Sequence, residues 1–208
     1  MKPTQQLPER FQQIALIDLI NNQRLFIIMN VIGVGLFLLF GWLFKMLFSL
    51  TRPDEIKAVL SININGIVSL SIVFVVLLLI LVLLVILHEG IHGLFFWILV
   101  RSKPKFAFKG FYAYAAAPEW YIPKGQYMII AMAPLLTISI CGIVLVSFIH
   151  PSLLLPLFIL LTLNASGSIG DLIVFAWLLG KPEDCLVTDK GERILIYRPD
   201  TNYAVGKS

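Results

Sequence analysis

Charged side chains are scarce in this chain. Only 13% of its 208 residues are Asp, Glu, Lys or Arg, whereas 59% are hydrophobic, and the mean hydropathy is +0.91. Soluble globular domains carry about 25% charged residues. The composition therefore excludes an ordinary soluble domain and predicts an integral membrane protein.

Cysteine is also scarce, and Cys141 and Cys185 lie in an apolar run and a polar tail, which indicates no disulfide framework. The apolar run that begins at Leu25 is too long for a signal-peptide core and has no small-residue cleavage site, so we expect that nothing is removed. Basic residues do not cluster with aromatic ones, and this pattern argues against a nucleic-acid partner.

Long apolar runs dominate the rest of the chain. A bilayer core of about 30 Å needs about 20 apolar residues in each helical span. Four segments qualify: Leu25–Leu50, Gly66–Val100, Gln126–Ile149 and Leu153–Gly180. The predicted fold class is an all-α integral membrane protein with four transmembrane helices and a transmembrane domain over residues 25–180. The second run has 35 residues and would reach about 50 Å as a helix, so part of it must tilt, break or be shielded by protein.

Basic residues are distributed unevenly between the two sides of such a four-helix protein. With alternating spans, three of the 16 Lys and Arg residues fall on one side: Lys45, Arg52 and Lys57. The other thirteen fall on the side that holds both termini: Lys2, Arg10, Arg24, Arg101, Lys103, Lys105, Lys109, Lys124, Lys181, Lys190, Arg193, Arg198 and Lys207. The positive-inside rule therefore predicts a multi-pass cell-membrane protein, surrounded by lipid, with both termini in the cytoplasm.

Two polar segments flank the spans. Residues 1–24 are predicted to form a cytoplasmic amphipathic segment, a short helix that lies along the membrane interface. Its apolar side chains recur at helical spacing, at Phe11, Ile14, Ala15 and Leu19. Residues 181–208 are predicted to form a cytoplasmic tail, in which "CLVTDKGERILIYRP" has two strand-like runs around a Lys-Gly turn. This pattern predicts a short β-hairpin.

The loop between the second and third spans, "KFAFKGFYAYAAAPEWYIPKGQY", is too apolar for a solvated connection. Gly110, Pro118 and Pro123 interrupt it, so it is not another span. We expect a partly re-entrant loop on the cytoplasmic side, with its aromatic residues as interfacial anchors. The alternative is an extended edge that pairs with a substrate strand.

Three ionisable side chains lie within the second span, in "VILHEGIHGLFF". Such groups cost several kcal/mol in a membrane and mark a function or an internal partner. His88 and His92 are four residues apart and share one helical face, close enough to bind a single ion, and Glu89 can reach a water held there. This H-E-x-x-H pattern predicts a zinc site. The alternative is a pair of histidines hydrogen-bonded by neighbouring helices.

A catalytic zinc site usually has three protein ligands and one open position. Of the 12 acidic residues, only Glu89 and Asp171 lie inside the spans, and His150 lies at an external corner. Elimination therefore predicts Asp171 as the third metal ligand. Glu119, in the "APEW" loop, is the reserve ligand if that loop folds inward.

The depths of the two predicted ligand positions agree. His92 lies nine residues before Arg101, and Asp171 lies ten residues before Lys181. At 1.5 Å per residue, both are about 14 Å inside the span.

The stretch "LNASGSIGDL" places Asn164 seven residues before Asp171, on the same face if the helix is regular. We interpret Asn164 as a tentative substrate-binding residue that bonds a metal ligand, the scissile carbonyl or the substrate backbone. An inter-helix contact is the alternative.

These residues resemble a known pattern. "HEGIHG" in one span, "GD" in a later one and the "APEW" loop are similar to the zincin peptidase family of bacterial multi-pass membrane proteins, from the second span to the tail. They are more distantly similar to the site-2 intramembrane metalloproteases. By this resemblance His88, His92 and Asp171 bind zinc. Glu89 is then the general base. Site-2 proteases carry a proline-rich stretch before Asp-Gly, whereas "NASGSIGDL" has no proline and leads to Leu, so Asn164 matches only loosely.

The predicted function is that of a zinc-dependent intramembrane metalloprotease, with Zn²⁺ as cofactor and a peptide or transmembrane protein as substrate. Glu89 would activate a zinc-bound water for peptide hydrolysis. One alternative is a non-enzymatic membrane protein that binds or carries a divalent metal, which leaves Glu89 without a task. Another is an inactive relative that binds substrate helices without cutting them.

Overall fold

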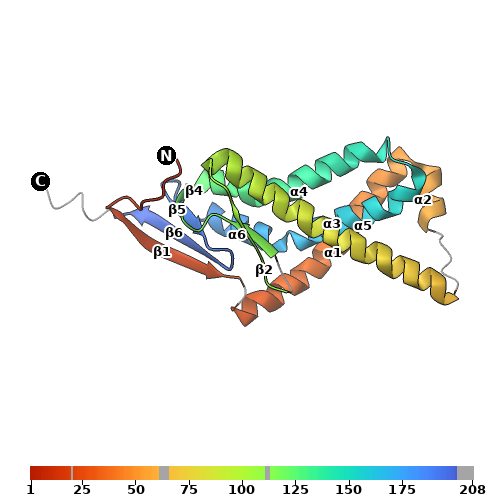
Figure 1. The fold of residues 1–208 in the computed structure, drawn as a ribbon, viewed down its shortest axis with the longest axis horizontal. Coiled ribbons are helices and arrows are strands. Elements are labelled where there is room, and N and C mark those ends of the chain that lie inside the picture. Colours follow the sequence, from red (N-terminus) through yellow and green to blue (C-terminus); the bar gives the residue numbers. More distant parts are fainter. Residues whose placement is uncertain (20, 61–65, 111–112, 201–208) are drawn as a thin grey trace, which may run out of the picture. The chain divides into compact units, whose positions relative to one another are not determined.

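A computed structural model of the chain describes residues 1–19, 21–60, 66–110 and 113–200. The helices are α1 (Gln23–Thr51), α2 (Pro53–Leu60), α3 (Gly66–Val100), α4 (Lys124–Val146), α5 (Leu154–Gly167) and α6 (Ile169–Leu179), with a 3-10 turn η1 (Pro151–Leu153) (Figure 1). The strands are β1 (Phe11–Asp18), β2 (Lys105–Phe108), β3 (Ala113–Ala116), β4 (Ile122–Pro123), β5 (Leu186–Asp189) and β6 (Arg193–Pro199).

The chain divides into two compact units. The first comprises the described residues of Met1–Ile28, Glu89–Ala133 and Gly170–Ser208. The second comprises the described residues of Met29–His88 and Pro134–Ile169. All strands therefore belong to the first unit. The same unit contains α3 from Glu89 onward, α4 up to Ala133 and α6 from Gly170 onward.

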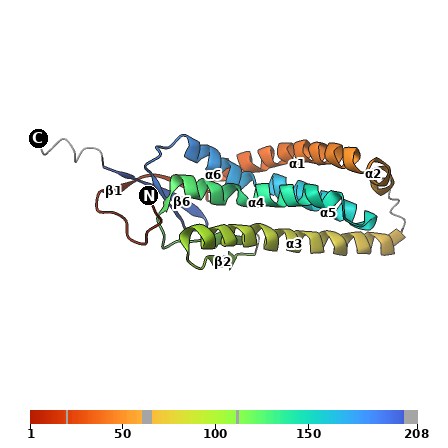
Figure 2. The ribbon, with the colours of Figure 1, turned by 90° about the horizontal axis from the view of Figure 1, so that it is seen from above.

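Four helical segments are long and apolar enough to cross a membrane, as predicted. They are Gln23–Thr51, Leu70–Val100, Lys124–Val146 and Pro151–Leu179. About 44% of the most apolar window is buried in each of the last two, against 0% and 6% in the first two. The broad apolar surface of α1 and α3 suits contact with lipid tails. Because α3 is one unbroken helix of 35 residues, a break in the second span is the wrong explanation for its length (Figure 2).

The fourth span is interrupted, which the sequence pattern did not predict. The helix α5 ends before Ser168, whose backbone N–H and hydroxyl both donate to the carbonyl of Asn164, at 3.0 and 2.8 Å. The helix α6 then begins at Ile169. The regular helix assumed between Asn164 and Asp171 is therefore wrong. Asp171 lies instead in the first turn of α6, where the exposed N–H groups favour a carboxylate.

A four-stranded antiparallel sheet with the strand order β1-β6-β5-β4 corrects the all-α fold class. The predicted tail hairpin is confirmed as β5 and β6, joined at Gly191, whose φ of +82° favours glycine. The predicted N-terminal helix is wrong, because residues 11–18 form β1 and pair with β6. Residues 201–208 of the predicted tail lie outside the described residues.

Tertiary pairing decides the conformation of β1. Ala15, Ile17 and Leu19 alternate along the chain and pack against the buried core, whereas Ile14 and Leu16 are exposed. The pairing of β1 with β6 shifts by one residue between Gln13 and Ala15, which is a β-bulge. Because of this extra residue, the spacing of Phe11, Ile14 and Ala15 resembles that of a helix. The period of two appears only after the bulge.

The ends of α3, α4 and α6 pack with the sheet in one hydrophobic core. Its buried members come from all these elements: Phe96, Val100, Ala117, Ile122, Tyr127, Ile130, Val174, Leu178, Cys185, Val187, Ile194 and Ile196. Full burial of one such apolar side chain contributes about 1.5–3 kcal/mol. The core therefore fixes the part of α3 that follows His92 against the part of α6 that follows Asp171.

The predicted loop between α3 and α4 is largely extended. Strands β2 and β3 form an antiparallel hairpin, and β4 joins the larger sheet beside β5. Strand β2 lies beside α3 (Figure 2). Phe106 of β2 lies over Gly93 of α3, where an added Cβ would come within 2.4 Å of its ring. Whether this segment enters the membrane, and whether it pairs with a substrate strand, stay predictions.

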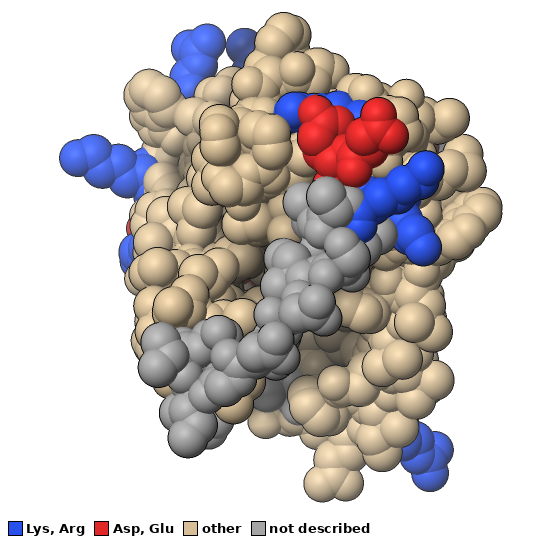
Figure 3. All heavy atoms as spheres, turned by 90° about the vertical axis from the view of Figure 1, so that its right-hand side faces the viewer, with Lys and Arg blue, Asp and Glu red and all other residues tan. Residues whose placement is uncertain are grey.

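Four charged side chains of the second unit lie in or next to α2: Arg52, Asp54, Glu55 and Lys57. Figure 3 shows an acidic group flanked by basic side chains, with other basic side chains at the margins of the view. Here Arg52 pairs with Glu55 at 2.8 Å and donates to the carbonyl of Ile149 at 2.5 Å. The Arg52 guanidinium holds the pKa of Glu55 below its ordinary value.

The close packing of α4 against α5 in the second unit predicts that a methyl group added at Gly142 lowers the stability of the protein. A Cβ at Gly142 of α4 would lie 2.3 Å from the buried side chain of Leu161 in α5. We expect Gly142→Ala to destabilise the protein by about 1–3 kcal/mol through overpacking. Gly35→Ala in α1 is the control, because no atom lies within 4 Å of its added Cβ. Thermal unfolding in mild detergent measures both variants, and equal unfolding temperatures would contradict the packing.

Candidate metal centre

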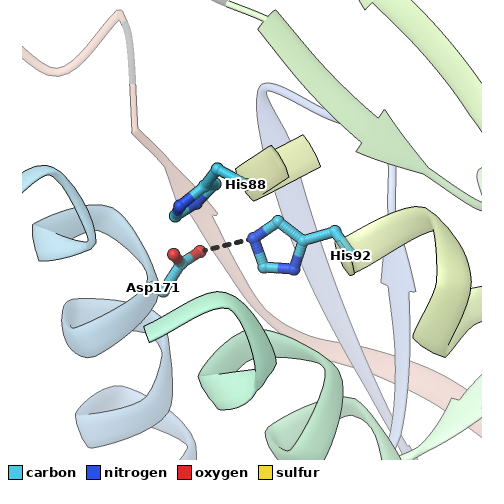
Figure 4. Close-up of side chains that lie close together, drawn as sticks. All are labelled: His88, His92 and Asp171. Carbon is cyan, nitrogen blue, oxygen red and sulfur yellow. Dashed lines mark ion pairs between the residues drawn. The ribbon is translucent and has the colours of Figure 1, made fainter. Parts of the chain in front are cut away.

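Two histidines and one aspartate come together around the H-E-x-x-H stretch of α3. The ligand atoms of His88, His92 and Asp171 all lie within 4.8 Å of one another (Figure 4). His92 and Asp171 belong to the first unit, and His88 lies one turn before His92 on the uninterrupted helix α3. The structure thus gathers the three residues that the sequence predicted as metal ligands.

The orientation of His92 is defined on both sides of its ring. Nδ1 lies 3.0 Å from the carbonyl oxygen of Ile130 in α4, and Nε2 lies 3.3 Å from Oδ1 of Asp171. Because a carbonyl only accepts hydrogen bonds, Nδ1 is the protonated nitrogen. When the ring is neutral, the Nε2 lone pair points at a carboxylate oxygen. Two electron-rich atoms at this distance need a proton or a metal cation between them.

His88 has a comparable arrangement. Its Nδ1 lies 3.1 Å from Oδ1 of Asn164, and Nδ2 of Asn164 donates to the carbonyl oxygen of Pro134 at 3.3 Å. The Pro134 carbonyl can only accept, which assigns the amide NH₂ to that side and Oδ1 to His88. Nδ1 of His88 therefore donates, and its Nε2 carries the lone pair. Both histidines present the same nitrogen for coordination.

The donor set fits zinc. Two ligands that are each about 2.0–2.1 Å from a tetrahedral zinc are about 3.3 Å apart, and the His92–Asp171 pair has this separation, 3.3 Å. Two imidazole nitrogens and one carboxylate oxygen are ordinary zinc ligands. Hydrogen bonds from the second ring nitrogen, as both histidines make, orient metal ligands in proteins.

Two residues considered as possible ligands lie elsewhere. Glu119, the reserve ligand, is an exposed loop residue that pairs with Lys105 at 2.5 Å. His150 caps η1 by accepting a hydrogen bond from the backbone of Ser152. Neither belongs to the metal-ligand group found among the described residues.

Glu89 is oriented by the β2–β3 hairpin. Its Oε2 accepts a hydrogen bond from the backbone N–H of Ala115 in β3, at 2.8 Å. This contact holds the carboxylate on the side of α3 that faces β3, next to His88 in the sequence. The residue pattern gives no signal for this contact, because Ala115 is 26 residues away from Glu89 in the chain.

The amide of Asn164 is bonded on both sides by protein groups, to His88 and Pro134. Asn164 is 1% exposed. A substrate contact by this residue stays a prediction.

Tyr127 and Asp189 form a buried pair near α3 that the residue pattern did not predict. Oδ2 of Asp189 in β5 accepts a hydrogen bond from the hydroxyl of Tyr127 in α4, and Oδ1 accepts one from the N–H of Gly191, both at 2.6 Å. Burial raises the pKa of Asp189 above its ordinary value, because it disfavours the charged form. The Tyr127 ring packs against Phe96, one turn after His92. The sequence pattern placed Asp189 in the predicted cytoplasmic tail and offered no signal for this contact.

Fold and site together define a class, namely proteins with four helices long and apolar enough to cross a membrane and a His-His-Asp group that could hold a metal ion. More specifically, the chain belongs to the family described as "Putative zincin peptidase", whose model matches residues 80–186, just over half of the 208 residues. The matched part contains His88, Glu89, His92 and Asp171. Searches of curated proteins and of solved structures gave no match.

The buried tyrosine gives a stability prediction. Tyr127→Phe leaves a carboxylate oxygen of Asp189 without its donor, so we expect a loss of about 1–3 kcal/mol of folding free energy. Tyr121→Phe removes the same hydroxyl from a tyrosine whose ring packs edge-on against Tyr197. In detergent, the unfolding temperature should decrease more for Tyr127→Phe than for Tyr121→Phe. The reverse order would show that the hydrogen bond between Tyr127 and Asp189 does not stabilise the fold.

Proposed function

We propose that this protein is a zinc-dependent intramembrane metallopeptidase that cleaves peptide bonds of a peptide or transmembrane protein in or near the membrane. The observation that carries the proposal is the meeting of His88, His92 and Asp171 directly beside Glu89. Membership of the zincin peptidase family supports it. The surrounding helices are apolar enough to lie in a bilayer, which supports a membrane location for the reaction.

In this proposal, His88, His92 and Asp171 hold the metal through Nε2, Nε2 and a carboxylate oxygen. Bound zinc supplies Lewis acidity, which lowers the pKa of a coordinated water and polarises a carbonyl group. Glu89 accepts the proton of the attacking water and passes it to the leaving amine nitrogen. The N–H of Ala115 orients the carboxylate of Glu89 through its Oε2.

The setting also favours this chemistry. His92 is buried, and its contact with Asp171 lies among apolar helices, where electrostatic interactions are stronger than in water. We further propose that both termini are cytoplasmic, because 13 of the 16 Lys and Arg residues fall on that side. The reaction would then take place in the cytoplasmic half of the membrane.

The metal content of variants distinguishes the proposed ligand Asp171 from the proposed general base Glu89. We expect about one zinc per wild-type chain in mild detergent, a strong loss in Asp171→Ala, and full retention in Glu89→Gln, because only the first change removes a ligand. Elemental analysis of the three purified proteins measures this. Zinc lost equally from Asp171→Ala and Glu89→Gln would show that Glu89 is a ligand and that the assigned roles are wrong.

Cleavage tests the function itself. Wild type and Glu89→Gln are each reconstituted in vesicles with a mixed set of single-span transmembrane polypeptides, and products are identified by mass spectrometry. We expect cleavage by the wild type and a loss of at least about 100-fold in Glu89→Gln, since general acid–base catalysis contributes about 10²–10⁴-fold.

Two outcomes would contradict this expectation. Equal cleavage by both proteins would refute the role of Glu89. Zinc flux into the vesicles that depends on Asp171, without cleavage of any polypeptide, would favour the metal-carrying alternative.

A further inference from the structure

A proline lies in the middle of α4, and the helix continues on both sides of it. Pro134 is buried within Lys124–Val146. Proline has no backbone N–H, so it cannot donate to the carbonyl four residues earlier in a helix. In α4 that carbonyl belongs to Ile130. The proline therefore deprives Ile130 of its regular intrahelical donor.

The carbonyl of Ile130 is the group that orients His92. It accepts the Nδ1 hydrogen of His92 at 3.0 Å, and this bond directs Nε2 toward Asp171. An ordinary residue at position 134 would place an N–H against the same oxygen and compete with the imidazole. The carbonyl would then tilt along the helix axis and away from α3.

Pro134 also acts on the other histidine. Its own carbonyl accepts the amide hydrogen of Asn164 at 3.3 Å, which turns Oδ1 of Asn164 toward Nδ1 of His88. Asn164 is buried, so water does not replace this contact. Pro134 thus affects both hydrogen bonds that favour the Nδ1–H tautomer, one at His92 and one at His88.

We propose that Pro134 is a positioning residue of the metal centre: by lacking a backbone N–H it reserves the Ile130 carbonyl for His92, and through Asn164 its own carbonyl orients His88. Asn164 is a positioning residue in the same network. This inference rests on the metal-binding part of the proposed function and not on peptide hydrolysis.

The test is the zinc affinity of the full-length protein. Pro134→Ala restores an N–H at position 134, and we expect zinc to bind about 10–100-fold more weakly, the range found when partners of metal ligands are lost. Competition with a chromophoric zinc chelator in mild detergent measures the affinity. The unfolding temperatures of the zinc-free proteins are measured in parallel. That of Pro134→Ala should not be lower than that of the wild type, because alanine is the better helix former.

Pro156→Ala is the matched control. Pro156 lies in the first turn of α5, a part of a helix where proline is favoured, and outside the hydrogen bonds that orient His88 and His92. We expect its zinc affinity to stay within about twofold of the wild type. The comparison separates the general effect of replacing a proline from the effect at position 134.

A second variant isolates the backbone N–H. The α-hydroxy analogue of alanine at position 134 has the alanine side chain and an ester oxygen in place of the N–H. We expect it to bind zinc more tightly than Pro134→Ala and close to the wild-type affinity. Equal weakening in both variants would show that the proline ring matters and not the missing donor, and would overturn the inference.

Three further results would also overturn it. The first is an unchanged affinity in Pro134→Ala. The second is a lower unfolding temperature of zinc-free Pro134→Ala, which would assign the proline a role in folding. The third is a wild-type protein that binds no zinc, which would overturn the proposed function as well. A wild type that binds zinc but cleaves nothing would contradict only the peptidase proposal and would leave the result at Pro134 intact.

Discussion

The structure depends on one constraint, which is that polar groups inside apolar helices need partners because the membrane interior supplies no water. His92 meets this constraint with a carbonyl on one side and Asp171 on the other. His88 meets it through Asn164. A hydrogen bond at Nδ1 of each ring favours the tautomer that presents Nε2, which is the nitrogen that the proposed metal site uses.

The sheet of the first unit supports these helices from outside the spans. Its core joins the ends of α3, α4 and α6, and the bond between Tyr127 and Asp189 links α4 to the tail hairpin. Strand β3 adds the backbone N–H that holds Glu89. The polar ends of the chain are therefore part of the site's framework, because they fix the helix ends that carry the ligands.

Much of this was predictable from residue patterns. Apolar runs of sufficient length predicted the four helices that are long and apolar enough to cross a membrane. The rarity of charge inside them singled out His88, His92 and Asp171. The tail hairpin followed from two strand-like runs around Gly191. The conformation of β1 was not predictable, since its bulge disguises the period of two. The interruption lies at Ser168, whose hydroxyl and backbone N–H both donate to the carbonyl of Asn164, and serine at this position gives no sequence signal for a helix break.

By itself the sequence determined which side chains are available for metal chemistry, because spacing along a helix places His88 and His92 on one face and most carboxylates lie outside the apolar segments. Only the tertiary structure decided how they are aimed. The carbonyl of Ile130, the amide of Asn164 and the N–H of Ala115 come from segments distant in the chain. Hydrogen bonds of this kind depend on distances and angles between elements, which no local pattern of residues encodes.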